Sequence, residues 1–396
     1  MRAPRISRRV CPRRQQQKGQ AVLFTIVLLG IIMTFSVYSF VRPRDPILAD
    51  NSQTERALAQ AKEVLIGYAA SNTTRPGRLP CPDRDGNGTA DTPCTSLLSI
   101  GFLPWKTLGI PDLRDGSGAI LLYAVSNVFG STTGVLNSDT AGDYSVTGLE
   151  SATEVIAIVF AAGSVVGSQQ RDLTVALCST TGTSIARNLC PENYLEGGNE
   201  DGNASYVTGM PKANFNDRLL LITKDNLFPA VLARVAREVR ASLNTFYANN
   251  SSFPNAAAFS DATYTCNPAI TQGRLAEVSA AGCPVLPAFP AAGSLPTWFS
   301  ANNWRPLIFY AVSSLCSSAV SAASCVSTGG LTVSGVSTNT QSLLIITGRA
   351  FAGQIPRPCM VLTNCLEDAE NINGDNLFQK PVPSTANNDL LVIVAP

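Results

Sequence analysis

The sequence predicts an α+β chain in which an N-terminal transmembrane helix is followed by two tandem units, each a helix packed on an antiparallel sheet of about four strands. Three observations lead to this prediction: an uncharged apolar run near the N-terminus, an internal repeat in the rest of the chain, and ten cysteines that fall in close sequential pairs beyond the run. Because 45% of the 396 residues are hydrophobic and only 14% are charged, the composition is that of a folded protein.

The apolar run extends from Ala21 to Val41. Its 21 residues would form a helix of about 31 Å, close to the roughly 30 Å hydrocarbon core of a membrane. Seven basic residues precede it and no acidic residue does, so we expect the N-terminus in the cytoplasm and the body across the membrane. The predicted divisions are a basic cytoplasmic leader, a transmembrane helix, a first unit and a second unit, at residues 1–19, 20–42, 43–228 and 229–396.

The composition also excludes several classes of function. The chain has no histidine, which excludes Ser-His-Asp and Cys-His nucleophiles and histidine metal ligands. From Asp45 onward there are 20 basic and 28 acidic residues, a balance of −8, which disfavours a nucleic-acid partner for the body. We therefore predict no catalytic residues and no enzyme activity.

Ten of the eleven cysteines lie beyond the apolar run, and Cys11 lies in the leader. An even number of cysteines in a histidine-free body favours disulfides over zinc or redox chemistry. Oxidising surroundings beyond a bacterial inner membrane are those of the periplasm. Pairing by proximity in the sequence gives Cys81 with Cys94, Cys178 with Cys190, Cys266 with Cys283, Cys316 with Cys325, and Cys359 with Cys365.

Five segments of the body occur twice. Chance likeness between apolar strands does not explain a register that holds without a gap over about 40 residues. At a shift of 187 the paired segments are 121–126 with 308–313, 146–148 with 333–335 and 156–159 with 343–346, and at shifts of 171 and 172 they are 193–196 with 364–367 and 216–222 with 388–394.

Each copy is predicted to open with an amphipathic helix, over residues 55–70 in the first and 231–247 in the second, because apolar residues recur there at helical spacing. Short β-rich runs separated by Gly, Asn and Asp turns then predict an antiparallel sheet, against which the apolar stripe of the helix packs. The expected strands are 118–125, 144–148, 153–161 and 218–223 in the first copy and 305–312, 331–335, 341–347 and 389–394 in the second.

The junction before the apolar run resembles the leader of type IV prepilins and type II secretion pseudopilins, a short basic segment that ends in glycine before an apolar helix. By that resemblance a prepilin peptidase would cut between Gly19 and Gln20, and other pilin-like subunits in the inner membrane would be partners. The family carries Glu at the fifth mature position, whereas this chain has Phe24 there, which favours a minor over a major subunit. An uncut signal anchor is the alternative reading.

Residues 58–68, 75–83, 103–109 and 216–220 also resemble a group of prepilin-like bacterial proteins. The resemblance covers most of residues 19–228 and, through the duplication, weakly covers the rest. It implies an envelope location and a pilin-like fold, and no established activity.

An acidic loop carries oxygen-bearing side chains at the spacing of a calcium loop, with glycine at the sixth position. The twelfth position, which would supply a bidentate Glu, is Cys94. The alternative is an Asn/Gly turn held by a disulfide. The candidate calcium ligands are Asp83, Asp85, Asn87, Thr89 and Asp91.

Two further groups have competing readings. Glu196 and Asp217 form a possible carboxylate pair for glycoside hydrolysis, but their recurrence in the second copy favours a structural role, with Glu196 paired to Arg218. Seven aromatic residues could line a binding groove, but more often such residues fill the seam between helix and sheet. They are Tyr68, Trp105, Tyr123, Phe160, Trp298, Trp304 and Tyr310.

The predicted function is that of a membrane-anchored, pilin-like minor subunit that acts by assembly or contact in a type IV pilus or type II secretion-like system. The runner-up is a calcium-dependent envelope adhesin held by an uncleaved signal anchor. A carboxylate-based hydrolase ranks third.

Overall fold

The computed structural model of the chain describes residues 33, 46–94, 100–171, 190–319, 325, 330–354, 357, 359 and 361–395. By their internal contacts the residues form two compact units, Met1–Asn51 and Ser52–Pro396, and all the sheets lie in the second. The description confirms the α+β class and the presence of two sheet-rich halves.

The predicted leader and transmembrane helix, including the junction of Gly19 and Gln20, lie outside the described residues except for Met33. Within the part of the chain that is described, none of the helices combines the length and the apolar character needed to cross a membrane.

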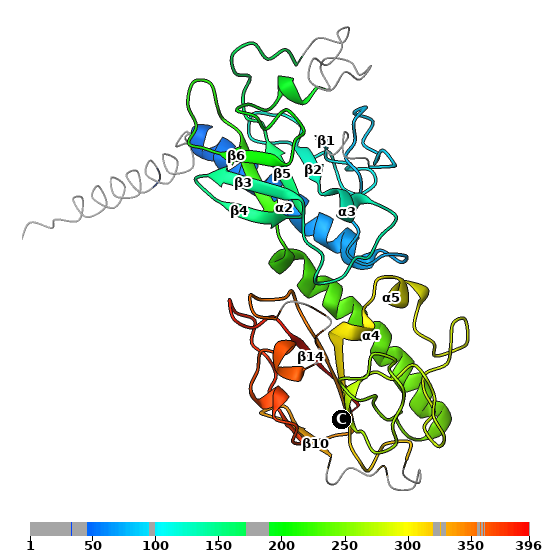
Figure 1. Cartoon of the computed structure of the whole chain (residues 1–396). Helices are drawn as coiled ribbons and strands as arrows, with labels where there is room; N and C mark the ends of the chain where they lie inside the picture. The colour runs from blue at the N-terminus through cyan, green and yellow to red at the C-terminus, as the bar shows by residue number, and fades with distance from the viewer. Residues whose placement is uncertain are drawn as a thin grey trace, which may run out of the picture. The chain divides into compact units, whose positions relative to one another are not determined.

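Two long helices were predicted and both are present, each extending further than its apolar stripe indicates. Helix α2 spans Pro46–Ser71 and helix α4 spans Lys224–Asn250. The start of α4 is set by Thr223, whose backbone amide donates to Asn226 Oδ1 at 3.1 Å. The apolar residues that recur at helical spacing along α4 are buried, and they form the face of the helix that packs on the second sheet. Figure 1 shows this sheet beside the green helix α4.

Each half has a four-stranded antiparallel sheet, as predicted, although its members differ from the predicted set. The edge strands at 100–102 and 272–274 were not predicted, and the predicted strands 144–148 and 331–335 lie in separate sheets. The order along the first is β1-β2-β5-β7, and along the second β8-β9-β12-β14. The first comprises β1 (Ile100–Phe102), β2 (Leu122–Val125), β5 (Ala157–Ala161) and β7 (Arg218–Ile222), and the second β8 (Gln272–Arg274), β9 (Ile308–Val312), β12 (Ser342–Ile346) and β14 (Leu390–Ala395).

Each half also has a three-stranded sheet, which the sequence did not predict. In both, the central strand pairs antiparallel with one neighbour and parallel with the other. The strands are β3 (Tyr144–Gly148), β4 (Ala152–Val155) and β6 (Ser205–Thr208) in the first half, and β10 (Leu331–Val333), β11 (Ser337–Thr340) and β13 (Leu377–Phe378) in the second. Short helices complete the described elements: α3 (Asn127–Gly130), α5 (Thr297–Ala301) and four 3₁₀ turns, η3 (Pro191–Asn193), η4 (Arg305–Leu307), η6 (Leu362–Asn364) and η7 (Glu370–Ile372).

The central strands are apolar along their whole length because both faces of each four-stranded sheet are covered. In β2, Tyr123 belongs to the core shared with the helices, whereas Leu122 and Ala124 belong to the core beneath the small sheet. The same alternation occurs in β9, where Tyr310 faces the helix side and Phe309 the small sheet. Since successive side chains of a strand point to opposite faces, each half has three layers: helix, large sheet and small sheet.

The internal repeat is a repeat of structure. The seven strands of one half match the seven of the other in chain order and in pairing. The paired residues correspond as well, but Val125 pairs with Ala157 and Val312 with Ser342, so β5 corresponds to β12 at a shift of 185. The predicted alignment of 156–159 with 343–346 at a gapless shift of 187 was therefore wrong, because the turn after β10 is two residues shorter than the turn after β3.

The buried tyrosines at the 187-residue shift also make the same contact, since the Tyr123 hydroxyl donates to the carbonyl of Pro80 at 3.2 Å and the Tyr310 hydroxyl to that of Pro254 at 2.8 Å. The two halves therefore share one local fold.

Four of the five predicted cysteine pairs are bonded. They close loops beside the sheets and join Cys81 to Cys94, Cys266 to Cys283, Cys316 to Cys325, and Cys359 to Cys365. Cys178, the predicted partner of Cys190, lies outside the described residues, so that pairing stays a prediction.

Candidate functional site

The acidic loop brings three of its five predicted ligands together. Carboxylate oxygens of Asp83, Asp85 and Asp91 all lie within 4.8 Å of one another. Asn87 and Thr89 instead bond to each other, because the Asn87 side-chain oxygen accepts from the Thr89 backbone amide at 2.7 Å and from its hydroxyl. A calcium ion takes six to eight oxygen ligands, and these three carboxylates would supply part of that set.

The same loop is also satisfied without an ion. The two side-chain oxygens of Asp83 accept from the amides of Gly86 and Gly88, at 2.9 and 2.7 Å. Asp91 Oδ2 accepts from the backbone amide of Arg84 at 2.7 Å and lies 3.8 Å from the Arg84 Nε. Glycine is required at Gly88, where φ is +87° and a Cβ would meet the ring of a tryptophan at 2.7 Å.

A second turn in the chain has the same local bonding without the other two carboxylates. Asn203 donates from its backbone amide to Asp201, as Asn87 does to Asp85. The side-chain-to-backbone hydrogen bond is therefore a property of the Asp-x-Asn turn. The acidic loop differs from the second turn because the carboxylates of Asp83, Asp85 and Asp91 lie close together in it. Burial, and secondarily the neighbouring Asp85, raises the pKa of Asp83 to about 6.

A second group of polar side chains lies beneath the last strand of the first half. Asp217, only 3% exposed, accepts from the backbone amide of Glu196 and from the side chain of Asn199, both at 2.9 Å. Glu196 accepts in turn from the Asn216 amide at 3.1 Å and from the side chain of Gln169 at 2.5 Å. The pair is thus held by amides of its own half.

Arg171 completes this group as its cation. It donates to Gln169 Oε1 at 3.0 Å, to the carbonyl of Gly163 at 2.8 Å and to the carbonyl of Asn193 at 2.9 Å, and it stacks over the Tyr194 ring at 4.8 Å. Its charge faces Glu196 and its partner carboxyl, so it compensates one negative charge on the pair.

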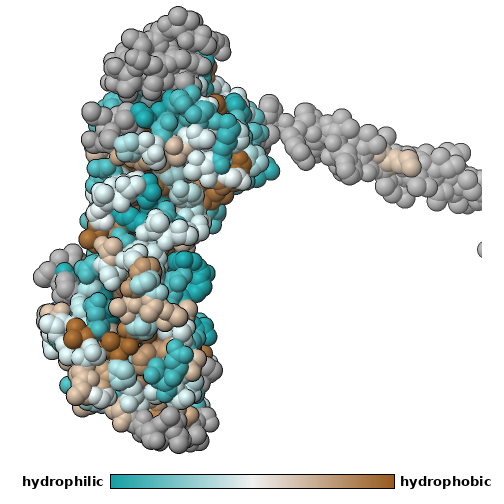
Figure 2. Space-filling model, turned by 90° about the vertical axis from the view of Figure 1, so that its right-hand side faces the viewer, coloured by the Kyte–Doolittle hydropathy of each residue, from teal (hydrophilic) through white to brown (hydrophobic). Residues whose placement is uncertain are grey.

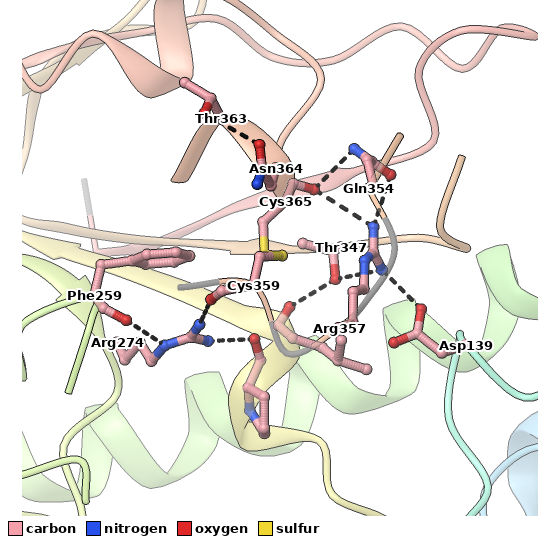
Figure 3. The surroundings of a disulfide bond; sticks show 12 residues. Asp139, Phe259, Arg274, Thr347, Gln354, Arg357, Cys359, Thr363, Asn364 and Cys365 are labelled. Carbon is pink, nitrogen blue, oxygen red and sulfur yellow. Dashed lines mark hydrogen bonds and ion pairs between the residues drawn. A yellow bond between two sulfur atoms is a disulfide. The ribbon is translucent and has the colours of Figure 1, made fainter. Parts of the chain in front are cut away.

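The second half repeats the arrangement, and Figure 3 shows its glutamine and arginine, Gln354 and Arg357, beside the Cys359–Cys365 disulfide. Gln354 donates to Glu367 at 2.8 Å and accepts from Arg357 at 3.0 Å. Asp389, 5% exposed, accepts from the Glu367 amide at 3.3 Å.

One contact of the second copy differs. Arg357 makes an ion pair of 2.9 Å with Asp139, a residue of the first half, and also donates to the carbonyl of Gly348 at 2.7 Å. The arginine of the second network therefore ties that network to the first half of the chain.

Burial raises the pKa of Asp217 to about 8, with a further contribution from the adjacent Glu196. Burial beside Glu367 likewise raises the pKa of Asp389 well above its ordinary value. The Glu196–Asp217 pair therefore keeps a proton at neutral pH, and burial shifts the second pair in the same direction. Because each pair is bound to backbone amides of its own half and occurs twice, we assign the pairs a structural role, which was the favoured reading. The predicted partner of Glu196 was wrong, since Arg218 pairs with Glu55 at 3.1 Å.

The remaining members of these networks were not predicted. Each of them recurs in the second half, at shifts of 185, 186 and 172 residues. Because these polar residues lie between the aligned segments, a comparison of apolar runs does not find them. These residues are Gln169, Arg171 and Asn199 in the first half and Gln354 and Arg357 in the second. Asn371, the counterpart of Asn199, bonds to the backbone of Gln379.

The aromatic side chains fill the core rather than a groove, as the sequence favoured. Five of the seven are buried, and two, Tyr68 and Trp105, are partly exposed. On the face of the molecule shown in Figure 2, hydrophobic residues stand in small groups among hydrophilic ones.

Comparison of the chain with models of protein families, with curated proteins and with solved structures gives no match. The inference of function therefore depends on the residues and their geometry.

Proposed function

We propose that this chain is a membrane-anchored, pilin-like minor subunit that acts by assembly or contact in a type IV pilus or type II secretion-like system. The observation that carries the proposal is the order of parts: a basic segment, an uncharged run of 21 residues, and a helix that packs on an antiparallel sheet, with helix and sheet then repeated.

Two further features support a location beyond the inner membrane. The described part of the body contains four disulfides, which form and persist in oxidising compartments such as the periplasm. The buried carboxyl pairs of both halves accept hydrogen bonds from the chain itself, which suits a body that acts through its surface.

Processing is the sharpest test of the proposal. The protein is extracted from membranes and its intact mass and N-terminal peptide are measured. Cleavage after Gly19 leaves Gln20 as the N-terminus, and the variant Gly19→Val keeps its leader while the neighbouring control Gln17→Ala loses it. An intact leader in the unmodified protein refutes the processed subunit, and deletion of the gene should abolish piliation or secretion.

The acidic loop favours one alternative, a calcium-dependent envelope adhesin held by an uncleaved signal anchor. Calcium bound only by the folded chain would raise its melting temperature. Asp85→Ala should abolish that rise, while Asp201→Ala, which removes the same turn bonds from a site without a carboxylate cluster, should preserve it. A melting temperature that calcium leaves unchanged removes this alternative.

A further inference from the structure

A cavity of about 470 Å³ opens where the first turns of α4 meet the start of β14. Phe228, Pro229 and Leu232 of the helix and Leu390 of the strand form apolar parts of its wall. Volumes of this size accommodate small organic ligands.

The equivalent place in the first half has a polar contact instead. Arg218 begins β7 and pairs across the sheet with the last residue of β5, as Leu390 begins β14 and pairs with the last residue of β12. The two residues are therefore equivalent by register. Arg218 reaches Glu55 of α2 in an ion pair of 3.1 Å, whereas Leu390 contributes an apolar wall to the cavity. At the seam between the long helix and the last strand, the second half therefore has apolar surface where the first half has a salt bridge.

The lining of the cavity also carries charge. Arg349 donates from Nε to Asp225 at 2.5 Å, and in the part of the chain that the structure describes its two terminal nitrogens donate to no protein atom. Lys224, also in the wall, pairs with Glu154 at 2.6 Å. Asp389, the other lining carboxyl, is 5% exposed and bound to backbone amides, so the accessible lining presents two cations against the single carboxylate of Asp225.

We propose that this cavity is a binding site for a small organic carboxylate with a compact apolar body, the body lying between α4 and Leu390 and the carboxylate on the terminal nitrogens of Arg349. Planar guanidinium groups bind carboxylates in two parallel hydrogen bonds, which is the geometry that the free end of Arg349 offers. This site is separate from the assembly role proposed above and does not depend on it.

The test is binding of 2-naphthoate to the purified full-length chain by titration calorimetry, with 2-naphthylmethanol as the uncharged probe. Saturable binding of one naphthoate per chain is expected, with affinity at least tenfold above that of the alcohol. Arg349→Gln should weaken naphthoate by about 10- to 100-fold and leave the alcohol unchanged, since a hydrogen bond to a charged group is lost.

A double variant tests the position of the apolar body. Pro229→Glu with Leu390→Arg places across the cavity the kind of ion pair found in the first half, and should abolish binding of both probes. Val336→Arg, which adds the same charge at a position that is 57% exposed and outside the cavity, should leave binding unchanged. Circular dichroism checks folding of the double variant, and Arg349→Gln with the two probes decides the outcome where that variant does not fold.

Three results overturn the proposal: no saturable binding of naphthoate at about 5 mM, which corresponds to a binding free energy weaker than about 3 kcal/mol, equal affinity for the acid and the alcohol, or unchanged affinity in a folded double variant.

Discussion

Replacing Asp217 with asparagine should make the stability of the chain less dependent on pH. The folded state holds a proton on the Glu196–Asp217 pair up to a pKa of about 8, while an unfolded aspartate loses its proton near pH 3.9. Between these values the folded state binds one more proton than the unfolded state. The contribution of this pair to the free energy of unfolding is therefore greatest in acid and falls as the pH rises through that interval.

The magnitude follows from the proton difference. One proton contributes a slope of about 1.4 kcal/mol per pH unit, so one pair costs the fold about 2.7 kcal/mol between pH 5 and pH 7. Asparagine is neutral at every pH, has nearly the shape of the protonated acid, and retains an oxygen to accept from the Glu196 amide and from Asn199. In Asp217→Asn the slope from this pair should disappear, while the pair in the second half keeps its own.

The assay is urea unfolding of the full chain with its disulfides intact, followed by circular dichroism at pH 5, 6 and 7. The control is Asp201→Asn, which changes an exposed turn carboxylate. A slope in Asp217→Asn equal to that of the unmodified chain would show that the pair does not hold a proton.

Three smaller changes test the packing. Gly348→Ala places a Cβ at 2.1 Å from the Asn388 side-chain oxygen and at 2.5 Å from its backbone oxygen, so we expect a loss of about 1–3 kcal/mol in unfolding free energy, and a loss below 0.5 kcal/mol would contradict the packing. Gly67→Ala has no atom within 4 Å of the new Cβ in a helical position, so chemical denaturation should show a gain of about 0.5–1 kcal/mol, and a loss there would mean that the site is not open. Tyr310→Phe leaves the carbonyl of Pro254 without its donor and should cost about 1–3 kcal/mol by the same measurement, with an unchanged free energy arguing against that hydrogen bond.

The elements that the sequence predicted are those whose own residues carry the pattern. The two long helices have apolar stripes, and the central strands are unbroken apolar runs because both of their faces are buried. One predicted strand, 153–161, is in fact two strands belonging to different sheets, β4 and β5, because Glu154 takes a φ of +55° and turns the chain before Ile156.

The elements that were missed depend on distant partners. Strand β11 reads Ser-Thr-Asn-Thr and has no apolar alternation, so only its pairing with β10 makes it a strand. Strand β13 has two residues and pairs in parallel with a strand more than 40 positions earlier. Such pairings depend on tertiary structure rather than on local propensity.

The candidate sites divide in the same way. The acidic loop was visible because its residues are neighbours, whereas the polar network of the first half joins three separate loops. Arg171 and Glu196, for example, are 25 positions apart in the sequence and are close only in the folded chain. The duplication was the one sequence signal that could have identified their partners.

Some features occur in both halves and stabilise their shared fold, whereas others occur in one half only. Both halves keep the carboxyl pair, its glutamine and its arginine, and these groups bind atoms of the chain, so their duplication is explained by the fold that they stabilise. The seam between helix and last strand is not duplicated, because Arg218 forms an ion pair there and Leu390 lines a cavity. Loss of a feature that both copies need for folding should destabilise the half that loses it. A feature present in only one copy can change without lowering the free energy of unfolding. Variants that remove the hydrogen bonds of the networks should therefore lower stability, whereas Asp217→Asn retains them. Arg349→Gln in the cavity should alter binding while the melting temperature stays the same.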